Sequence, residues 1–146
     1  MNVIICIDKR GGMIFNKRRV SRDKLVCEDI LKTVRGEKLY IKPYSKILFD
    51  PLADRYELPE ISDDPMSIAK DGEWCFIEDE DVSAYADRIE RLLVYNWNES
   101  YPYDLRFDMS ILDQLFRISG RTKFPGHSHD MVVRELYRKD FRDKAK

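Results

Sequence analysis

Continuous apolar runs, separated by amphipathic segments, dominate the first hundred residues. The longest are NVIICI at 2–7, EWCFI at 73–77 and LLVYNW at 92–97, and KLYIK at 38–42 is shorter. Runs that are apolar on both faces are typical of strands covered on both sides of a sheet. We therefore expect the first of them, which is also rich in β-branched residues, near the centre of a sheet.

Segments with helical spacing lie between these strands. The segment 21–34 has apolar positions at helical spacing, namely Leu25, Ile30, Leu31 and Val34. Ser21 is predicted to cap this helix and Gly36 to end it. Residues 81–92 predict a second, short helix. Strands that alternate with helices predict crossover connections and a mostly parallel sheet.

The remaining segments are shorter. Pro43 ends the second strand and Ser45 is placed to cap a short helix, while 50–73 is predicted to hold loop, an edge strand and a turn of helix near 66–69. FRIS at 116–119 and MVVRELY at 131–137 suit the two sides of a hairpin joined by the loop 120–130. We expect this antiparallel pair to close one edge of the sheet, with residues 142–146 as a frayed tail.

Composition narrows the class of protein. The chain has 146 residues, 43% of them hydrophobic and 36% charged, which favours one globular domain spanning 1–146. No apolar run approaches the roughly 20 residues of a membrane-spanning helix. Cys6, Cys27 and Cys75 are odd in number and widely spaced, so we expect buried reduced thiols and a cytoplasmic protein, without a disulfide framework or a metal site.

Charge is segregated along the chain. Residues 9–24 contain one acid, Asp23, and seven basic residues, namely Lys9, Arg10, Lys17, Arg18, Arg19, Arg22 and Lys24. Residues 50–90 carry an excess of Asp and Glu. The two regions can form solvated faces, attract an anionic ligand to the basic side, or pair with each other within or between subunits.

Four acids, Glu78, Asp79, Glu80 and Asp81, stand between a predicted strand and a predicted helix. In an open α/β sheet this junction commonly binds a phosphate, because free helix N–H groups and the positive end of the helix dipole point into it. Here we expect Asp81 to cap the helix and its neighbours to complement the dipole.

The order of elements resembles dihydrofolate reductase along nearly the whole chain. NVIICIDKRGGMIFNKR looks like the opening strand and mobile loop of that family, KLYIKPYSKIL like its Gly-Arg-x-Thr segment, and residues 75–97 like the strand, glycine-rich turn, helix and strand that hold the cofactor diphosphate. DLRFD, FRIS and GHSHDMVVRELYRK look like its last elements. The resemblance implies a three-layer α/β/α fold with a mostly parallel central sheet, NADPH as cofactor and a pterin-like substrate.

The cofactor motifs depart from the family pattern. Glu78-Asp79 replaces a glycine pair that lets the backbone approach the diphosphate, and a carboxylate there repels phosphate. The Gly-Arg-x-Thr arginine is absent, although Lys42, Ser45 and Lys46 can still serve an anion. The Pro-Trp of the mobile loop is replaced by residues 18–20, Arg-Arg-Val.

The substrate acid of the family is also displaced. The position nearest to it holds Cys27, so Asp23 and Glu28 are the available carboxylates, and Asp23 also suits the first turn of a helix. His127 and His129 flank Ser128 in a predicted loop, where no third metal ligand is visible. A base and an orienting acid for a serine cannot be identified from the spacing.

Three hypotheses remain open. The first is a divergent, non-reductase protein that binds a small molecule or a partner in the cleft. The second is an NADPH-dependent reductase that holds phosphate through Lys42, Ser45 and Lys46. The third is nucleic-acid binding through the basic residues of 17–24, which is disfavoured because no aromatic residues are interleaved there.

Overall fold

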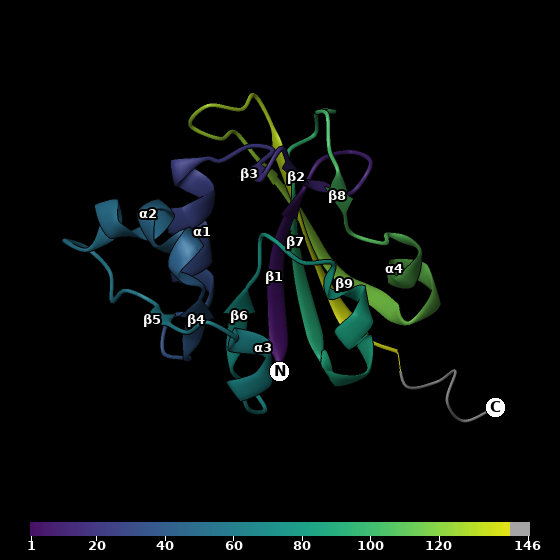
Figure 1. The fold of residues 1–146 in the computed structure, drawn as a ribbon, viewed down its shortest axis with the longest axis horizontal. Coiled ribbons are helices and arrows are strands. Elements are labelled where there is room, and N and C mark those ends of the chain that lie inside the picture. Colours follow the sequence, from purple (N-terminus) through teal and green to yellow (C-terminus); the bar gives the residue numbers. More distant parts are fainter. Residues whose placement is uncertain (141–146) are drawn as a thin grey trace.

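A seven-stranded sheet forms the centre of the molecule (Figure 1). The computed structural model describes residues 1–140, so the tail expected at 142–146 lies outside the described residues. In spatial order the strands are β5 (Glu60–Ile61), β4 (Leu39–Ile41), β6 (Trp74–Phe76), β1 (Asn2–Ile7), β7 (Arg91–Asn96), β10 (Val132–Lys139) and β9 (Phe116–Phe124). The first five are parallel, whereas β10 runs antiparallel to both β7 and β9. The mostly parallel sheet with an antiparallel C-terminal edge hairpin is therefore confirmed.

Helices cover both faces of this sheet and make three layers (Figure 1). They are α1 (Lys24–Thr33), α2 (Lys46–Phe49), α3 (Pro65–Ile68) and α4 (Ser110–Gln114), with the 3₁₀ helices η1 (Pro43–Ser45), η2 (Asp50–Leu52) and η3 (Val82–Arg88). Among the described residues, no helix is long and apolar enough to span a bilayer.

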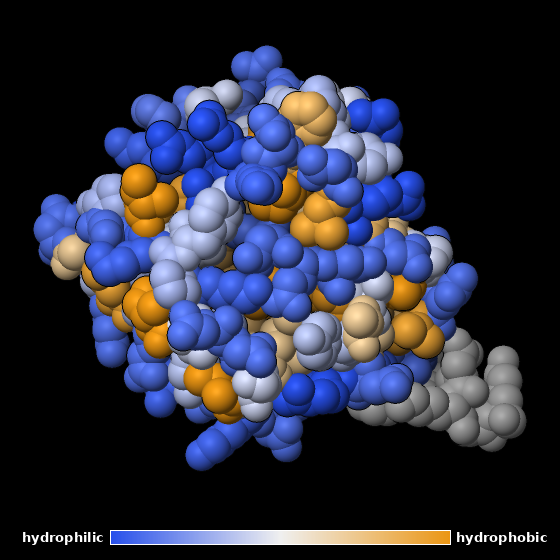
Figure 2. Space-filling view, in the orientation of Figure 1, coloured by the Kyte–Doolittle hydropathy of each residue, from blue (hydrophilic) through white to orange (hydrophobic). Residues whose placement is uncertain are grey.

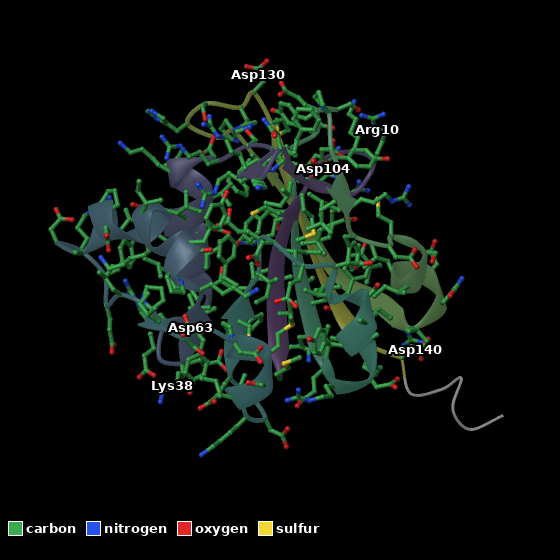
Figure 3. All side chains as sticks on the ribbon, viewed as in Figure 1. Arg10, Lys38, Asp63, Asp104, Asp130 and Asp140 are labelled. Atoms are coloured by element: carbon green, nitrogen blue, oxygen red, sulfur yellow. The ribbon has the colours of Figure 1, made fainter. Side chains whose placement is uncertain are left out.

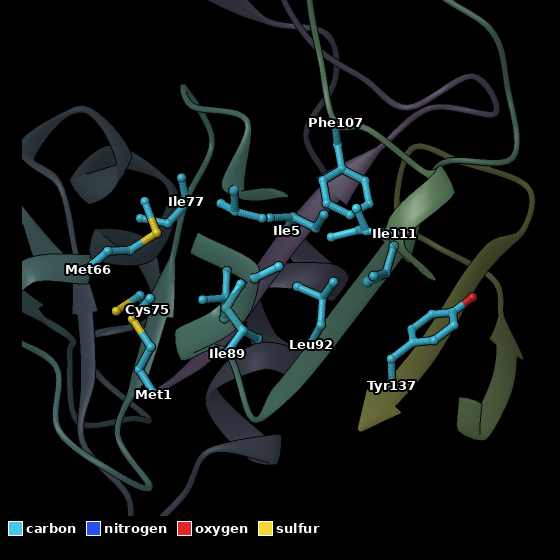
Figure 4. Close-up of a cluster of buried hydrophobic side chains, with 14 of the residues drawn as sticks. Met1, Ile5, Met66, Cys75, Ile77, Ile89, Leu92, Phe107, Ile111 and Tyr137 are labelled. Atoms are coloured by element: carbon cyan, nitrogen blue, oxygen red, sulfur yellow. The ribbon is translucent and has the colours of Figure 1, made fainter. Parts of the chain in front are cut away.

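The central strand divides its side chains between two hydrophobic clusters, because successive residues of a strand point to opposite faces. Ile4 packs with the apolar side of α1, whereas Val3 and Ile5 pack with η3 and α4. Figure 4 shows the second cluster, in which Ile5 lies among side chains from several elements. The expectation that β1 is central and covered on both faces is confirmed.

A small second sheet stands beyond the carboxyl end of β1, in the order β3 (Arg18–Arg19), β2 (Gly12–Phe15), β8 (Leu105–Arg106). The buried carboxylate of Asp8 fixes the turn that leads into it, accepting hydrogen bonds from the backbone N–H groups of Arg10 and Gly12, both at 2.8 Å. Its other oxygen accepts from Tyr101 N at 2.9 Å. The basic segment is thus partly strand, where the sequence predicted only a loop.

Three sequence predictions of element ends are corrected. Asp23, not Ser21, is the N-cap of α1, and its carboxylate accepts from Leu25 N at 2.9 Å. Leu25 faces outward and is 38% exposed, because the buried face of the helix is formed by Val26, Cys27, Ile30 and Leu31. The helix ends at its C-cap Val34, before Gly36. Strand β9 continues to Phe124 through residues predicted as loop, since they pair with β10.

Candidate functional site

Two polar clusters flank the cleft between α1 and the carboxyl ends of β1 and β6. The first is the acidic turn, residues 78–81, which follows β6. The second is the Asp23 cluster, formed by Ser21, Asp23, His129 and the backbone of 127–128. In an open parallel sheet, ligands usually bind outside the carboxyl ends of the strands.

Glu78 is the most buried acid of the acidic turn, with 7% of its surface exposed. Arg19 donates to both of its oxygens, from Nε to Oε2 at 2.7 Å and from Nη2 to Oε1 at 3.0 Å. Ser45 Oγ donates to Oε1 at 2.6 Å. Although burial of Arg19 opposes its charge, the hydrogen bond and negative charge of Glu78 outweigh that effect and raise the pKa of the guanidinium. This pair joins the basic segment to the acidic one within the chain.

Tyr44 holds Arg19 from the other side. The guanidinium of Arg19 lies 4.2 Å from the centroid of the Tyr44 ring, and Nη2 donates to the Tyr44 carbonyl oxygen at 3.0 Å. The phenol oxygen of Tyr44 accepts from Arg19 N at 2.9 Å. Such stacking adds to a charge-assisted pair, because the ring face attracts the cation. Arg19 therefore has a fixed orientation over the acidic turn.

Lys42 also binds the acidic turn. Its Nζ donates to Asp79 Oδ1 at 2.8 Å and to Glu80 Oε2 at 2.5 Å. Burial opposes the charge of Lys42, yet these two carboxylates raise its pKa. Asp81 accepts from Ser83 N at 3.0 Å, so its predicted role as a helix cap is confirmed. The cationic and hydroxyl groups beside the turn thus already hold carboxylates of the chain itself.

The carboxylate of Asp23 is the centre of the second cluster, and its side chain is fully buried. Besides capping α1, its Oδ1 accepts from His127 N at 2.9 Å, and its Oδ2 accepts from Ser128 N and from His129 Nδ1, both at 2.8 Å. Burial alone would raise the pKa of Asp23, but these hydrogen bonds, led by that of His129, hold it far below its usual range. Asp23 is therefore an anion that ties the loop between β9 and β10 to the start of α1.

His129 connects Asp23 to a serine. Because its Nδ1 faces an ionised carboxylate, that nitrogen carries the proton, and Nε2 is the acceptor for the hydroxyl of Ser21 at 2.7 Å. The imidazole stacks on Trp97 with 4.6 Å between ring centroids and 19° between planes. Gly126 allows this approach, since a Cβ there would lie 2.5 Å from Asp23 Oδ2. The ring of His129 is consequently fixed in position and in tautomer.

Two cavities adjoin these clusters. A groove of about 400 Å³, which we call the basic groove, opens beside β2 and β3 and is lined by Phe15, Asn16, Arg18, Arg19, Val20, Tyr101 and Pro102. A narrow space of about 10 Å³ lies between β1 and α1, with Ser21, Cys27 and Glu78 among its lining residues. Side chains therefore leave little free volume between β1 and α1, and the larger of the two cavities is the basic groove.

Figures 2 and 3 show the surface around this end of the molecule. Hydrophilic side chains cover most of the face in view, with scattered apolar ones between them (Figure 2). Arg10 and Asp104 lie at the end where the small sheet stands, and Asp130 lies there too, on the loop between β9 and β10 (Figure 3). The small sheet, whose strands β2 and β3 line the basic groove, and the loop that carries His129 thus lie at the same end of the protein.

Another cavity, of about 480 Å³, lies at the other end of the strands, between the end of α1 and the start of β4. Arg35, Lys38 and Tyr56 are among its lining residues. Since the carboxyl ends of the strands are on the opposite side, this cavity is separate from the two polar clusters.

The structure places the predicted site residues in different surroundings. Lys42 and Ser45 do come together, at the acidic turn, whereas Lys46 pairs with Asp50 at 2.7 Å and is largely exposed. Asp23 lies at the helix cap. Glu28 forms ion pairs on the outside of α1, with Arg55 at 2.8 Å and Lys32 at 3.3 Å, and does not join Asp23. Any action of these residues on a ligand stays a prediction.

Sequence reasoning missed the roles of Arg19, Ser21 and Trp97 in these clusters. The excess of basic residues in 9–24 was a signal for Arg19, because a segment so rich in cations beside an acidic one favours pairing. No sequence signal identified the contact of Ser21 with His129, because the two residues are 108 positions apart.

The fold is that of dihydrofolate reductase. A solved structure of dihydrofolate reductase from Enterococcus faecalis, complexed with NADP(H) and RAB-propyl, matches with a TM-score of 0.62 over 96% of each chain, at 11% sequence identity. No family model matches the sequence, and no curated protein matches it. At this identity the likeness establishes the architecture alone, and function has to be argued from the site.

Proposed function

We propose that this chain is a divergent dihydrofolate reductase-like protein that binds a small anionic molecule in the basic groove and does not carry out ordinary NADPH-dependent reduction. The observation that carries this proposal is the engagement of Arg19, Lys42 and Ser45 by the carboxylates of the acidic turn. A phosphate in that position would have to displace three ion pairs and would meet negative charge.

The basic groove supports the choice of an anionic ligand. Its volume of about 400 Å³ falls in the range of small-molecule sites. Arg18 lines the groove and forms no ion pair within residues 1–140, so its guanidinium is available to a carboxylate or phosphate. Phe15 and Tyr101 line the same groove and offer rings to a flat ligand.

Benzoate and benzamide test this assignment, since they share a ring and differ in charge. We expect benzoate to raise the melting temperature and benzamide to have no effect. Saturation at about 100 times the dissociation constant adds about 2.7 kcal/mol of stability, which corresponds to several degrees. The measurement is a thermal shift at low salt on the wild-type protein and on Arg18→Ala.

The variant provides the control. Because Arg18 has no ion pair in the described chain, Arg18→Ala should melt at the wild-type temperature without ligand and show no benzoate shift. Equal shifts with benzoate and benzamide, or an unchanged benzoate shift in Arg18→Ala, would contradict the assignment of an anion site.

A further inference from the structure

We propose that Ser21, His129 and Asp23 form a nucleophilic triad that hydrolyses small esters carrying a negative charge. The choice of an anionic ester rests on the proposed function of the basic groove. The triad itself rests on its own geometry and is independent of that function.

The three side chains have the connectivity that nucleophilic catalysis requires. Ser21 Oγ lies 2.7 Å from Nε2 of His129, and Nδ1 of the same ring lies 2.8 Å from Asp23 Oδ2. In a Ser-His-Asp triad, one ring nitrogen accepts the hydroxyl proton while the other donates to a buried carboxylate. Such triads are recognised by these roles and not by their positions in a fold or a sequence.

The surroundings keep each member in its role. Asp23 is held ionised by its hydrogen bonds to the backbone of 127–128 and to α1, so it orients the imidazole and stabilises the imidazolium. Trp97 stacks on the ring of His129 and fixes its plane. A structural helix cap needs only an acceptor for the N–H groups, whereas this arrangement also aims Nε2 at a hydroxyl.

Ser21 stands at the border between the narrow space beside α1, which it lines, and the basic groove. It is partly exposed, and it directly follows Val20, which lines the basic groove. The next residue, Arg22, is exposed and lines the same narrow space as Ser21, so positive charge is present beside the hydroxyl.

The reaction is an acyl transfer to water. Ser21 Oγ forms a bond to the carbonyl carbon while its proton passes to Nε2 of His129, and the carbon–oxygen bond to the alcohol breaks as the alcohol takes up that proton. Water then attacks the acyl-serine and gives a proton to Nε2. The carbon–oxygen bond to Ser21 breaks, the carboxylic acid leaves, and Ser21 recovers its proton. No oxidant or reductant is needed.

A fluorophosphonate probe tests the nucleophile without any requirement for groove binding. We expect one probe per chain in the intact mass, located on the peptide that contains Ser21. Ser21→Ala should lose the label, and Ser119→Ala, a distant exposed serine, should keep it. His129→Gln should slow labelling by about 100-fold or more, the usual contribution of a general base.

Hydrolysis of two activated esters tests the substrate class. We expect 4-nitrophenyl succinate, which is an anion, to be cleaved faster than 4-nitrophenyl acetate, and Arg18→Ala to remove this preference. Labelling without the preference would overturn the anionic groove and leave the triad supported. Absence of label on Ser21 in a wild-type protein of normal melting temperature would overturn the triad, and so would equal labelling in Ser21→Ala.

Discussion

Replacement of Asp23 by alanine is expected to lower the free energy of unfolding by about 3–5 kcal/mol, because several buried donors each lose a charged acceptor at about 1–3 kcal/mol and the helix loses its cap at about 1 kcal/mol. The change removes the cap of α1 and leaves His129 Nδ1 and the N–H groups of His127 and Ser128 without their acceptor in a buried place. Urea unfolding of both proteins, followed by far-UV circular dichroism, measures the difference.

Asp81→Ala is the matched control, because Asp81 caps η3 through Ser83 N and otherwise accepts only a long, exposed hydrogen bond from Asp108 N at 3.3 Å. Its expected cost is about 1 kcal/mol, typical of a cap alone. Equal losses in the two variants would show that Asp23 is only a cap and that its contacts with the loop between β9 and β10 add nothing.

The lowered pKa of Asp23 also predicts how the free energy of unfolding changes with pH. The pKa of Asp23 is lowered in the folded state, from about 3.9 in an unfolded chain. Its contribution is therefore fully present above about pH 4 and is lost as the pH falls through the lower folded value. Between about pH 5 and pH 2, the wild-type protein should lose more stability than Asp23→Ala does.

The second large effect is expected at Arg19. Arg19→Ala leaves Glu78 as a buried carboxylate with only the Ser45 hydroxyl as donor, since the guanidinium provides its other hydrogen bonds. The side chains of Arg19 and Glu78 are 15% and 7% exposed, so solvent replaces the lost cation poorly. We expect a loss of about 3 kcal/mol in the free energy of unfolding, at the lower end for a broken buried pair.

Arg18→Ala is the neighbouring control, because Arg18 is exposed and unpaired within residues 1–140. It should change the free energy of unfolding by less than about 0.5 kcal/mol, as is usual for a surface substitution. Urea unfolding of the two variants side by side makes the comparison. A cost at Arg19 no larger than that at Arg18 would contradict the view that Arg19 is locked onto the acidic turn.

Much of the fold was predictable from local pattern. The run at 2–7 is apolar on both faces, and this alone indicated a central strand, while alternation with helices indicated a parallel sheet. The small sheet was not predictable, because β3 has only two residues and β2 pairs with β8, which is about ninety positions away. The start of α1 was misplaced since Ser21 and Asp23 are both good N-caps, and only the contacts of Asp23 with 127–129 decide between them.

The part of the candidate site that could be predicted is the acidic turn, because its charges can be read directly from the sequence. The sequence indicated that the acidic turn is unsuited to a phosphate. It offered Lys42 and Ser45 as ligands of an anion, and the structure brings both of them to the carboxylates of that turn. The partner of Asp23 was beyond sequence reasoning, since His129 is 106 positions away and the loop that carries it is positioned by the hairpin of β9 and β10. Glu28 was a poor candidate because α1 directs it toward Arg55.

Calorimetric titration with NADPH, at low and at moderate salt, tests most directly whether the acidic turn has taken the place of the cofactor phosphates. The account predicts no saturable heat up to about 1 mM cofactor, equivalent to a binding free energy weaker than about −4 kcal/mol, and an unchanged melting temperature. Saturable binding with a micromolar dissociation constant would contradict it, because Lys42 and Arg19 would then have left the carboxylates of the turn for the phosphates.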